Sequence, residues 1–165
     1  MDLTTVIKIR RSIREYQEKE IPDNILDEIL DCARMAPTAM NLQPWLIGCV
    51  TDKRLLESIA ELADHGKFIR QAAACFTVFC RKDVKYYLED GCAATMNIIL
   101  GAAAKGIGTC WVAGDKKTYA EDIRKLLNVP EEYTLVSLVS AGYAMNSPRP
   151  IKKDIKEISF KNKYR

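Results

Sequence analysis

Three arginines and a serine fall within five residues near the start of the chain: Arg10, Arg11, Ser12 and Arg14. A guanidinium group is always charged, and its planar set of N–H donors matches the oxygens of a phosphate. A serine hydroxyl can add a neutral donor to the same oxygens. The cluster therefore predicts a phosphate-anchoring site for a nucleotide-like ligand. The alternative interpretation is a solvent-exposed basic face.

A second polar group lies in the segment Ala36–Trp45, where two prolines and several small residues predict a loop. This loop carries the hydroxyl of Thr38 and the carboxamides of Asn41 and Gln43. A carboxamide offers a donor and an acceptor together, which suits the edge of a heterocycle such as a pyrimidine-dione. The alternative is a loop whose polar side chains bond its own backbone.

The other reactive residue types argue against several classes of enzyme. The one histidine, His65, has no acid or nucleophile spaced near it, so we expect it on a loop or at the surface. The six cysteines form no CxxC pair, and we expect them to be reduced. We expect no metal site, because metal ligands do not cluster at useful spacing. The chain contains no GxGxxG sequence, which is the pattern of a dinucleotide-binding turn.

The 165 residues suit one domain with a single sizeable core. The formal charge of +3, from 25 basic and 22 acidic side chains, is too small to indicate a nucleic-acid or membrane partner. There is no apolar run of about 18 residues that would span a bilayer. The first residues also lack the basic-then-apolar layout of a secretory signal. We therefore expect a cytoplasmic protein.

Apolar residues at helical spacing predict five helices. The first begins near the start of the chain and runs into the arginines. The second begins at an N-cap, Asp23, and the third follows the cap at Asp52. The fourth and longest covers about residues 87–105. The fifth begins at a capping box formed by Thr118 and Glu121.

Small residues lie nearly all round the longest predicted helix. We therefore expect it to be buried and closely approached by other elements, including a second copy of the chain. We expect Met96 on this helix to pack rather than to contact a cofactor. Short apolar runs predict strands over residues 45–50, 72–80, 109–112 and 135–141. Helices and strands alternate along the chain, which indicates a mixed layout in one domain.

Residues 146–165 differ from the rest of the chain. The prolines near its start require an extended backbone, and Lys152 and Lys153 make the segment basic. Ile155 and Phe160 are apolar enough to pack against another surface. This composition predicts a C-terminal arm that docks on a neighbouring subunit, with a loosely ordered tail as the alternative.

The two polar motifs together resemble the nitroreductase family of flavoproteins. The match continues in the same order through Asp90, Ala94 and Asn97, then Gly106–Trp111, and finally Gly142 with Tyr143. It covers essentially the whole chain, residues 1–165. The resemblance implies an α+β nitroreductase-like sandwich, in which helices flank a central, mostly antiparallel sheet. It also implies a homodimer that holds FMN at two interface sites.

The resemblance also implies which residues bind FMN. Those from one subunit would be Arg10, Arg11, Ser12, Arg14, Val112, Ala113 and Gly114. Those from the partner subunit would be Pro37, Thr38, Ala39 and Asn41, with Gln43 nearby. The C-terminal arm would return to the phosphate through Arg149 and Lys152, or through Lys153. Arg14 and backbone donors near Gly114 would stabilise the reduced flavin.

The implied activity is transfer of a hydride from NADH or NADPH to the flavin. Electrons would then pass to a nitroaromatic, quinone or similar acceptor in a ping-pong mechanism, with no protein nucleophile. The chain lacks long insertions after His65 and Arg81, which predicts an open active site. Alternatives on the same fold are a reductive dehalogenase, a flavin-fragmenting enzyme, and a flavin-binding module with little turnover.

Overall fold

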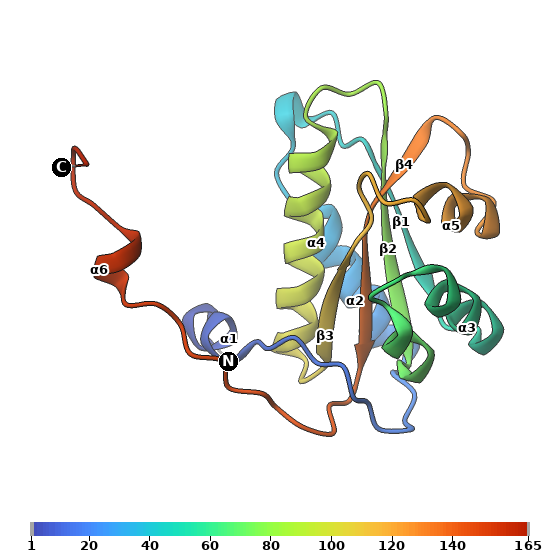
Figure 1. Cartoon of the computed structure of the whole chain (residues 1–165), viewed down its shortest axis with the longest axis horizontal. Helices are drawn as coiled ribbons and strands as arrows, with labels where there is room; N and C mark the ends of the chain where they lie inside the picture. The colour runs from blue at the N-terminus through green and yellow to red at the C-terminus, as the bar shows by residue number, and fades with distance from the viewer. Residues whose placement is uncertain (1, 165) are drawn as a thin grey trace.

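The computed structural model describes residues 2–164 and contains a four-stranded sheet in the order β1-β2-β4-β3 (Figure 1). The strands are β1 (Trp45–Val50), β2 (Ala74–Arg81), β3 (Gly108–Ala113) and β4 (Tyr133–Gly142). All three pairings are antiparallel. The expected α+β sandwich is confirmed, and each predicted strand lies within two residues of its observed bounds.

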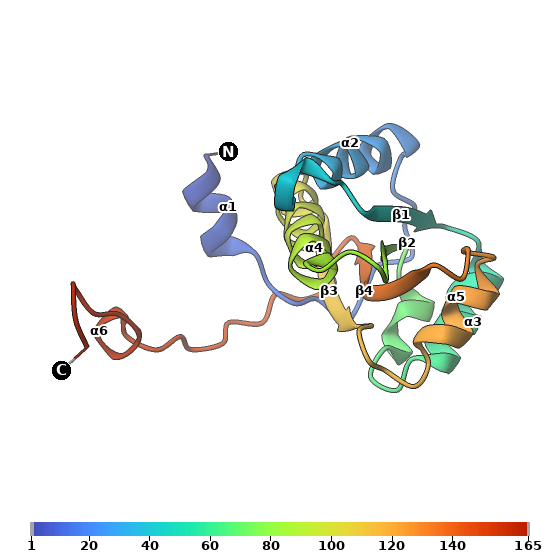
Figure 2. The same cartoon turned by 90° about the horizontal axis from the view of Figure 1, so that it is seen from above.

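Helices cover both faces of this sheet (Figure 2). The α-helices are α1 (Leu3–Ile9), α2 (Asp23–Arg34), α3 (Lys53–Leu62), α4 (Tyr87–Ala104), α5 (Ala120–Leu126) and α6 (Ile155–Ile158). Two short 3-10 helices are η1 (Ala39–Asn41) and η2 (Lys67–Gln71). Helices α2 and α4 pack on one face of the sheet, and α3 and α5 pack on the other. None of the helices within residues 2–164 is long and apolar enough to cross a membrane.

Two predicted helix caps are wrong. Pro22, not Asp23, is the N-cap of α2, because its carbonyl already accepts the first helical hydrogen bonds, from Ile25 and Leu26. The predicted capping box of α5 does not form: the N-cap is the buried Tyr119, which makes no side-chain capping bond. The Asp52 cap of α3 is confirmed, since its carboxylate accepts from the N–H of Leu55 at 2.9 Å.

The central strand β2 explains why the molecule has two apolar clusters. Residues 74–80 are all buried, and their side chains point alternately to opposite faces of the sheet. Phe76 packs in the cluster beneath α2 and α4, whereas Phe79 packs in the cluster beneath α3 and α5. A strand covered on both sides reads as a continuous apolar run, which is the pattern seen in the sequence.

The small residues of α4 permit close packing against α2, as predicted. A Cβ on Gly101 would lie 3.0 Å from Cβ of Cys32 on α2. Nearby, the carboxamide of Asn97 donates to the carbonyl oxygen of Cys32 at 2.9 Å. Met96 is 39% exposed and thus lies outside the core of the single chain.

The two ends of the chain project from this body (Figures 1 and 2). Helix α1 exposes Leu3 and Ile7, and the C-terminal arm exposes Ile151 and Phe160. The start of the arm is tied to the body where the N–H of Met145 and the carboxamide of Asn146 both bond Glu15. Beyond this point the side chains of the arm are exposed through residue 164.

Candidate functional site

The arginine segment runs along the open edge of β3. The N–H of Ile13 donates to the carbonyl oxygen of Thr109 at 2.8 Å, and Ser12 forms a parallel bridge to the same residue. Ile13 is buried, which fixes the segment against the strand. An extended backbone advances about 3.3 Å per residue, so Arg10 and Arg14 stand about 13 Å apart along this edge.

At one end of the segment lies a pocket of about 150 Å³, called the Arg10 pocket. Its wall includes Arg10, Arg11, Ile13, Ala103, Gly106, Gly108, Thr109 and Ser147. Within the described part of the chain, no aspartate or glutamate lines it. Two arginines without a nearby acid favour an anion such as a phosphate.

The two arginines of this pocket have different roles. The Nη1 atom of Arg11 donates to the carbonyl oxygens of Lys8 and Arg10, at 2.6 and 2.8 Å. These bonds hold the C-terminal end of α1, where carbonyls lack helical partners. Arg11 is therefore committed in part to the local backbone. Arg10 is the stronger candidate for an anion contact.

At the other end of the segment is a pocket of about 450 Å³, called the Arg14 pocket. Its lining is mainly basic and aromatic, and no aspartate or glutamate among residues 2–164 contributes to it. The lining residues are Arg14, His65, Phe68, Trp111, Val112, Ala113, Lys117 and Tyr119. The guanidinium carbon of Arg14 lies 5.8 Å from the centroid of the Phe68 ring, within range of a cation–π contact. Such a lining suits a flat heterocycle that carries partial negative charge.

Backbone groups of β3 add hydrogen-bonding capacity between the two pockets. Because β3 is an edge strand, every second residue directs its N–H and C=O away from β4. Thr109 and Ala113 have this orientation, since their carbonyls accept from the Ile13 N–H and the Tyr119 hydroxyl. Trp111 shares it, so its N–H and C=O, together with the Ala113 N–H, face the open edge.

Gly114 has a structural role in this chain. Its N–H and that of Asp115 both donate to the carbonyl oxygen of Val136, at 3.0 and 3.2 Å. A Cβ on Gly114 would lie 2.6 Å from Cγ of Leu135, so a larger residue does not fit. The donor near Gly114 that remains available to a ligand is therefore the N–H of Ala113.

The loop Pro37–Gln43 lies at the opposite end of α4 from the arginine segment (Figure 1). The N–H of Ala39 donates to Oδ1 of Asp90 in the first turn of α4, whereas Ala103 in its last turn lines the Arg10 pocket. Thirteen helical residues at 1.5 Å each separate these points by about 20 Å. One chain thus does not bring its two predicted motifs together.

The loop has an unusual backbone that is held by its own hydrogen bonds. Met40, Asn41 and Gln43 all have positive φ angles, of 52°, 54° and 49°. The hydroxyl of Thr38 accepts from the N–H of Gln43 at 3.2 Å, and the Gln43 carboxamide donates to the Asn41 carbonyl at 3.4 Å. Thr38 and Gln43 therefore support the loop itself, as the alternative interpretation predicted.

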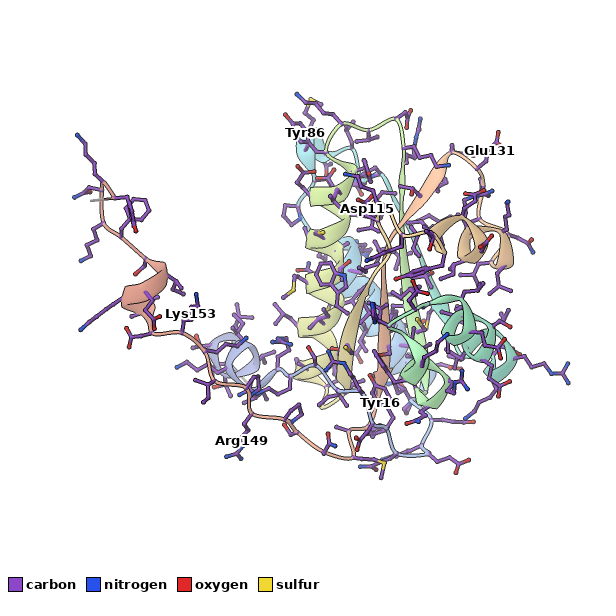
Figure 3. All side chains as sticks on the ribbon, viewed as in Figure 1. Tyr16, Tyr86, Asp115, Glu131, Arg149 and Lys153 are labelled. Atoms are coloured by element: carbon purple, nitrogen blue, oxygen red, sulfur yellow. The ribbon has the colours of Figure 1, made fainter. Side chains whose placement is uncertain are left out.

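The predicted residues of the arm, Arg149, Lys152 and Lys153, do not line the Arg10 pocket of their own chain. Arg149 and Lys153 lie on the extended, exposed part of the arm, and the side chain of Arg149 points away from the body (Figure 3). Lys152 between them is exposed as well. Ser147, which lines the Arg10 pocket, is where the arm leaves the site.

Sequence reasoning missed several residues of the site. Of the residues that line the Arg14 pocket, His65, Phe68, Lys117 and Tyr119 come from two connecting segments that meet only in the folded chain. No local pattern indicates this meeting. Asp90 belonged to the recognised motif, but its burial and its bond to the loop could be found only in the structure.

Comparison with known proteins identifies the family. The model of the nitroreductase family matches residues 7–87 and 65–143. The chain belongs to the nitroreductase family. A protein of Methanothermobacter thermautotrophicus named "Putative NADH dehydrogenase/NAD(P)H nitroreductase" is 33% identical over 153 residues, which cover 90% of this chain and 80% of that protein.

Other proteins also resemble the chain in fold or in sequence. The solved structure of an FMN-dependent nitroreductase from Clostridium difficile has a TM-score of 0.88 and 29% identity, covering 95% of this chain and 98% of its own. An iodotyrosine deiodinase of Thermotoga neapolitana is 25% identical over 173 residues, covering 90% of this chain and 91% of that protein.

Proposed function

We propose that the protein is an FMN-dependent oxidoreductase. It takes a hydride from NADH or NADPH and passes electrons to nitroaromatic, quinone or similar acceptors in a ping-pong mechanism. The observation that carries this proposal is a pair of pockets along the open edge of β3, one at Arg10 and one at Arg14, to whose linings no described aspartate or glutamate contributes. The FMN dependence of the Clostridium difficile relative and the NAD(P)H in the archaeal relative's name support it.

The donor set along this edge fits each part of FMN, which joins a phosphate to a flat heterocycle through a hydroxylated chain. Arg10 and Ser12 would bind the phosphate, with Arg11 as a lesser contact. The open-edge groups of Trp111 and Ala113 would bond the ring, and Arg14 would oppose negative charge on it. When bound, FMN supplies the electron-transfer chemistry, while these residues bind and orient it.

The protein does not need a nucleophile for this chemistry, and the thiols of Cys49, Cys75 and Cys80 are unsuited to provide one. Burial raises the pKa of Cys75 and of Cys80 to about 12, and that of Cys49 to about 11. Thiols with such pKa values stay protonated near neutral pH and are poor nucleophiles. This supports a reaction carried by a bound cofactor.

We infer that the working form is a cytoplasmic homodimer in which each FMN contacts both subunits. The separation of about 20 Å between the loop Pro37–Gln43 and the Arg10 pocket supports this, because a second copy can supply the loop. Exposed apolar side chains on α1 and on the arm supply surface to bury. In this arrangement residues 146–165 would pack on the partner subunit, and Arg149, Lys152 or Lys153 would reach the phosphate.

An absorption spectrum of the purified protein tests the cofactor. We expect bound flavin, or its uptake when FMN is added, and anaerobic bleaching when NADH or NADPH is titrated. Reoxidation by nitrofurazone or menadione should follow. Protein that stays colourless after FMN addition would contradict the proposal. Tight FMN binding with slow reoxidation by every acceptor would instead identify a flavin-binding module.

Reductive dehalogenation is a second candidate, favoured by the likeness to the iodotyrosine deiodinase across 90% of this chain. Assays with halotyrosine, nitrofurazone and menadione under identical reducing conditions separate the two activities. Turnover of halotyrosine well above that of the other acceptors would favour the dehalogenase. The opposite order would favour the nitroreductase activity.

A further inference from the structure

Asp90 presents a buried carboxylate that is only half satisfied. It lies in the first turn of α4, and the residue is 5% exposed. Its Oδ1 accepts from the N–H of Ala39 at 3.0 Å. No donor within residues 2–164 bonds its Oδ2, which is also buried. A buried carboxylate oxygen without a donor costs stability, so its retention requires a reason.

The thiol of Cys80, whose pKa responds to the charge of Asp90, does not satisfy this oxygen. Burial and then the charge of Asp90 raise the pKa of the Cys80 thiol to about 12, so Cys80 stays protonated near Asp90. Among the hydrogen bonds of the described residues, however, Cys80 makes none to Asp90. No described residue of the single chain therefore supplies the missing donor.

The bond to Ala39 alone does not explain a carboxylate. It anchors the start of η1 to α4, while the other hydrogen bonds of the loop join the loop to itself, such as Leu42 N–H to the Ala39 carbonyl and Gln43 N–H to the Thr38 hydroxyl. One acceptor oxygen is enough for that anchor, and the carboxamide of an asparagine would supply it. The second oxygen of Asp90 is the part that an asparagine could not replace.

We propose that Asp90 is a positioning residue whose Oδ2 accepts a hydrogen bond from a hydroxyl or N–H that arrives when the cofactor site is assembled. The donor comes either from FMN or from a second copy of the chain. By bonding both this donor and Ala39, Asp90 holds the loop in the shape that contacts FMN. The FMN source rests on the proposed function; the second-copy source does not.

The variant Asp90→Asn tests the role of Oδ2, because it keeps an oxygen for Ala39 and places an NH2 group where Oδ2 stands. We expect the affinity of the binding step that brings the donor, either FMN binding or dimerisation, to fall about 10-fold to 100-fold, because the NH2 group of asparagine would then face another hydrogen-bond donor. Glu89→Gln is the matched control: it removes the same charge from the neighbouring, exposed residue. We expect it to stay within about twofold of wild type.

Two measurements on each protein distinguish the sources. FMN affinity is measured by flavin fluorescence, and the dimer dissociation constant of the FMN-free protein by analytical ultracentrifugation. If FMN brings the donor, Asp90→Asn weakens FMN binding and leaves the FMN-free dimer unchanged. If a second copy brings it, the FMN-free dimer weakens as well. If wild type binds no FMN, the proposed function fails, and the dimer measurement still tests Asp90.

The proposal is overturned if Asp90→Asn matches wild type in both equilibria, because Asp90 would then serve only to anchor the loop. A crystal structure of the wild-type protein with FMN provides a test that does not depend on the variant folding. A donor within about 3.2 Å of Oδ2 would support the proposal. An Oδ2 still without a donor in the FMN-bound dimer would overturn it.

Discussion

The N–H of Ile13 donates to the carbonyl oxygen of Thr109 at 2.8 Å, and this bond carries the arginine segment onto the edge of β3. Ile13 is 4% exposed and packs against Gly108, where a Cβ would lie 2.7 Å from Cγ1 of Ile13. The position of the proposed phosphate contact therefore depends on an apolar side chain and a glycine that bind nothing themselves.

Gly108→Ala should destabilise the fold by about 1–3 kcal/mol through overpacking, and should also weaken FMN binding. Ile13→Ala removes the atoms closest to the added methyl group. The double variant should thus be less destabilised than the sum of the two single variants. Urea unfolding of the four proteins measures this coupling. Strict additivity would contradict the close contact.

Arg10→Ala should weaken FMN binding by about 10-fold to 100-fold, since a charge-assisted bond to phosphate is lost. Arg11→Ala is the matched control within the same pocket. It should cost about 1 kcal/mol of stability, because Arg11 bonds the Lys8 and Arg10 carbonyls, and it should change FMN affinity less. Fluorescence titration and thermal unfolding measure the two effects. Equal losses of affinity would refute the division of roles.

Removal of residues 146–165 should separate assembly from folding. The arm buries no side chain in the body between residues 146 and 164, so the truncated chain should keep its circular dichroism spectrum and its cooperative unfolding. Dimer affinity and FMN affinity should both fall, because the arm is proposed to pack on the partner subunit and to reach the phosphate. Sedimentation and flavin titration are the measurements. An unchanged dimer would show that the arm is a loose tail.

Stability should fall steeply in alkaline solution. Burial raises the pKa of Cys75 to about 12, from an ordinary value near 9. A raised folded-state pKa means that the unfolded chain loses its proton first, so this contribution is complete below pH 9 and is lost between pH 9 and 12. Cys80 acts in the same direction, and burial also raises the pKa of Tyr16.

Urea midpoints measured from pH 7 to 11 under reducing conditions test this dependence. Wild type should lose stability above pH 9, and Cys75→Ala should lose it less steeply, because one of the titrating groups is absent. Identical slopes for the two proteins would show that the Cys75 thiol does not contribute.

The helices and strands could be predicted from the sequence because their signals are local. Apolar spacing indicated α2, α3 and α4, and continuous apolar runs indicated β1 and β2. Predictions failed where a single contact decided the outcome. At α5, Tyr119 rather than Thr118 became the N-cap, and its hydroxyl instead bonds the carbonyl of Ala113.

The sequence alone also determined the types of residue at the site. It contains a basic cluster near its start, a loop that carries carboxamides, and the motifs of the family in their order along the chain. Only the tertiary structure decided what each residue does. It turned Arg11 toward the end of α1, committed the Gly114 amide to Val136, and left Oδ2 of Asp90 without a donor among the described residues. Residue type and spacing are properties of the chain, whereas burial and hydrogen-bond partners depend on residues that meet only when the chain folds.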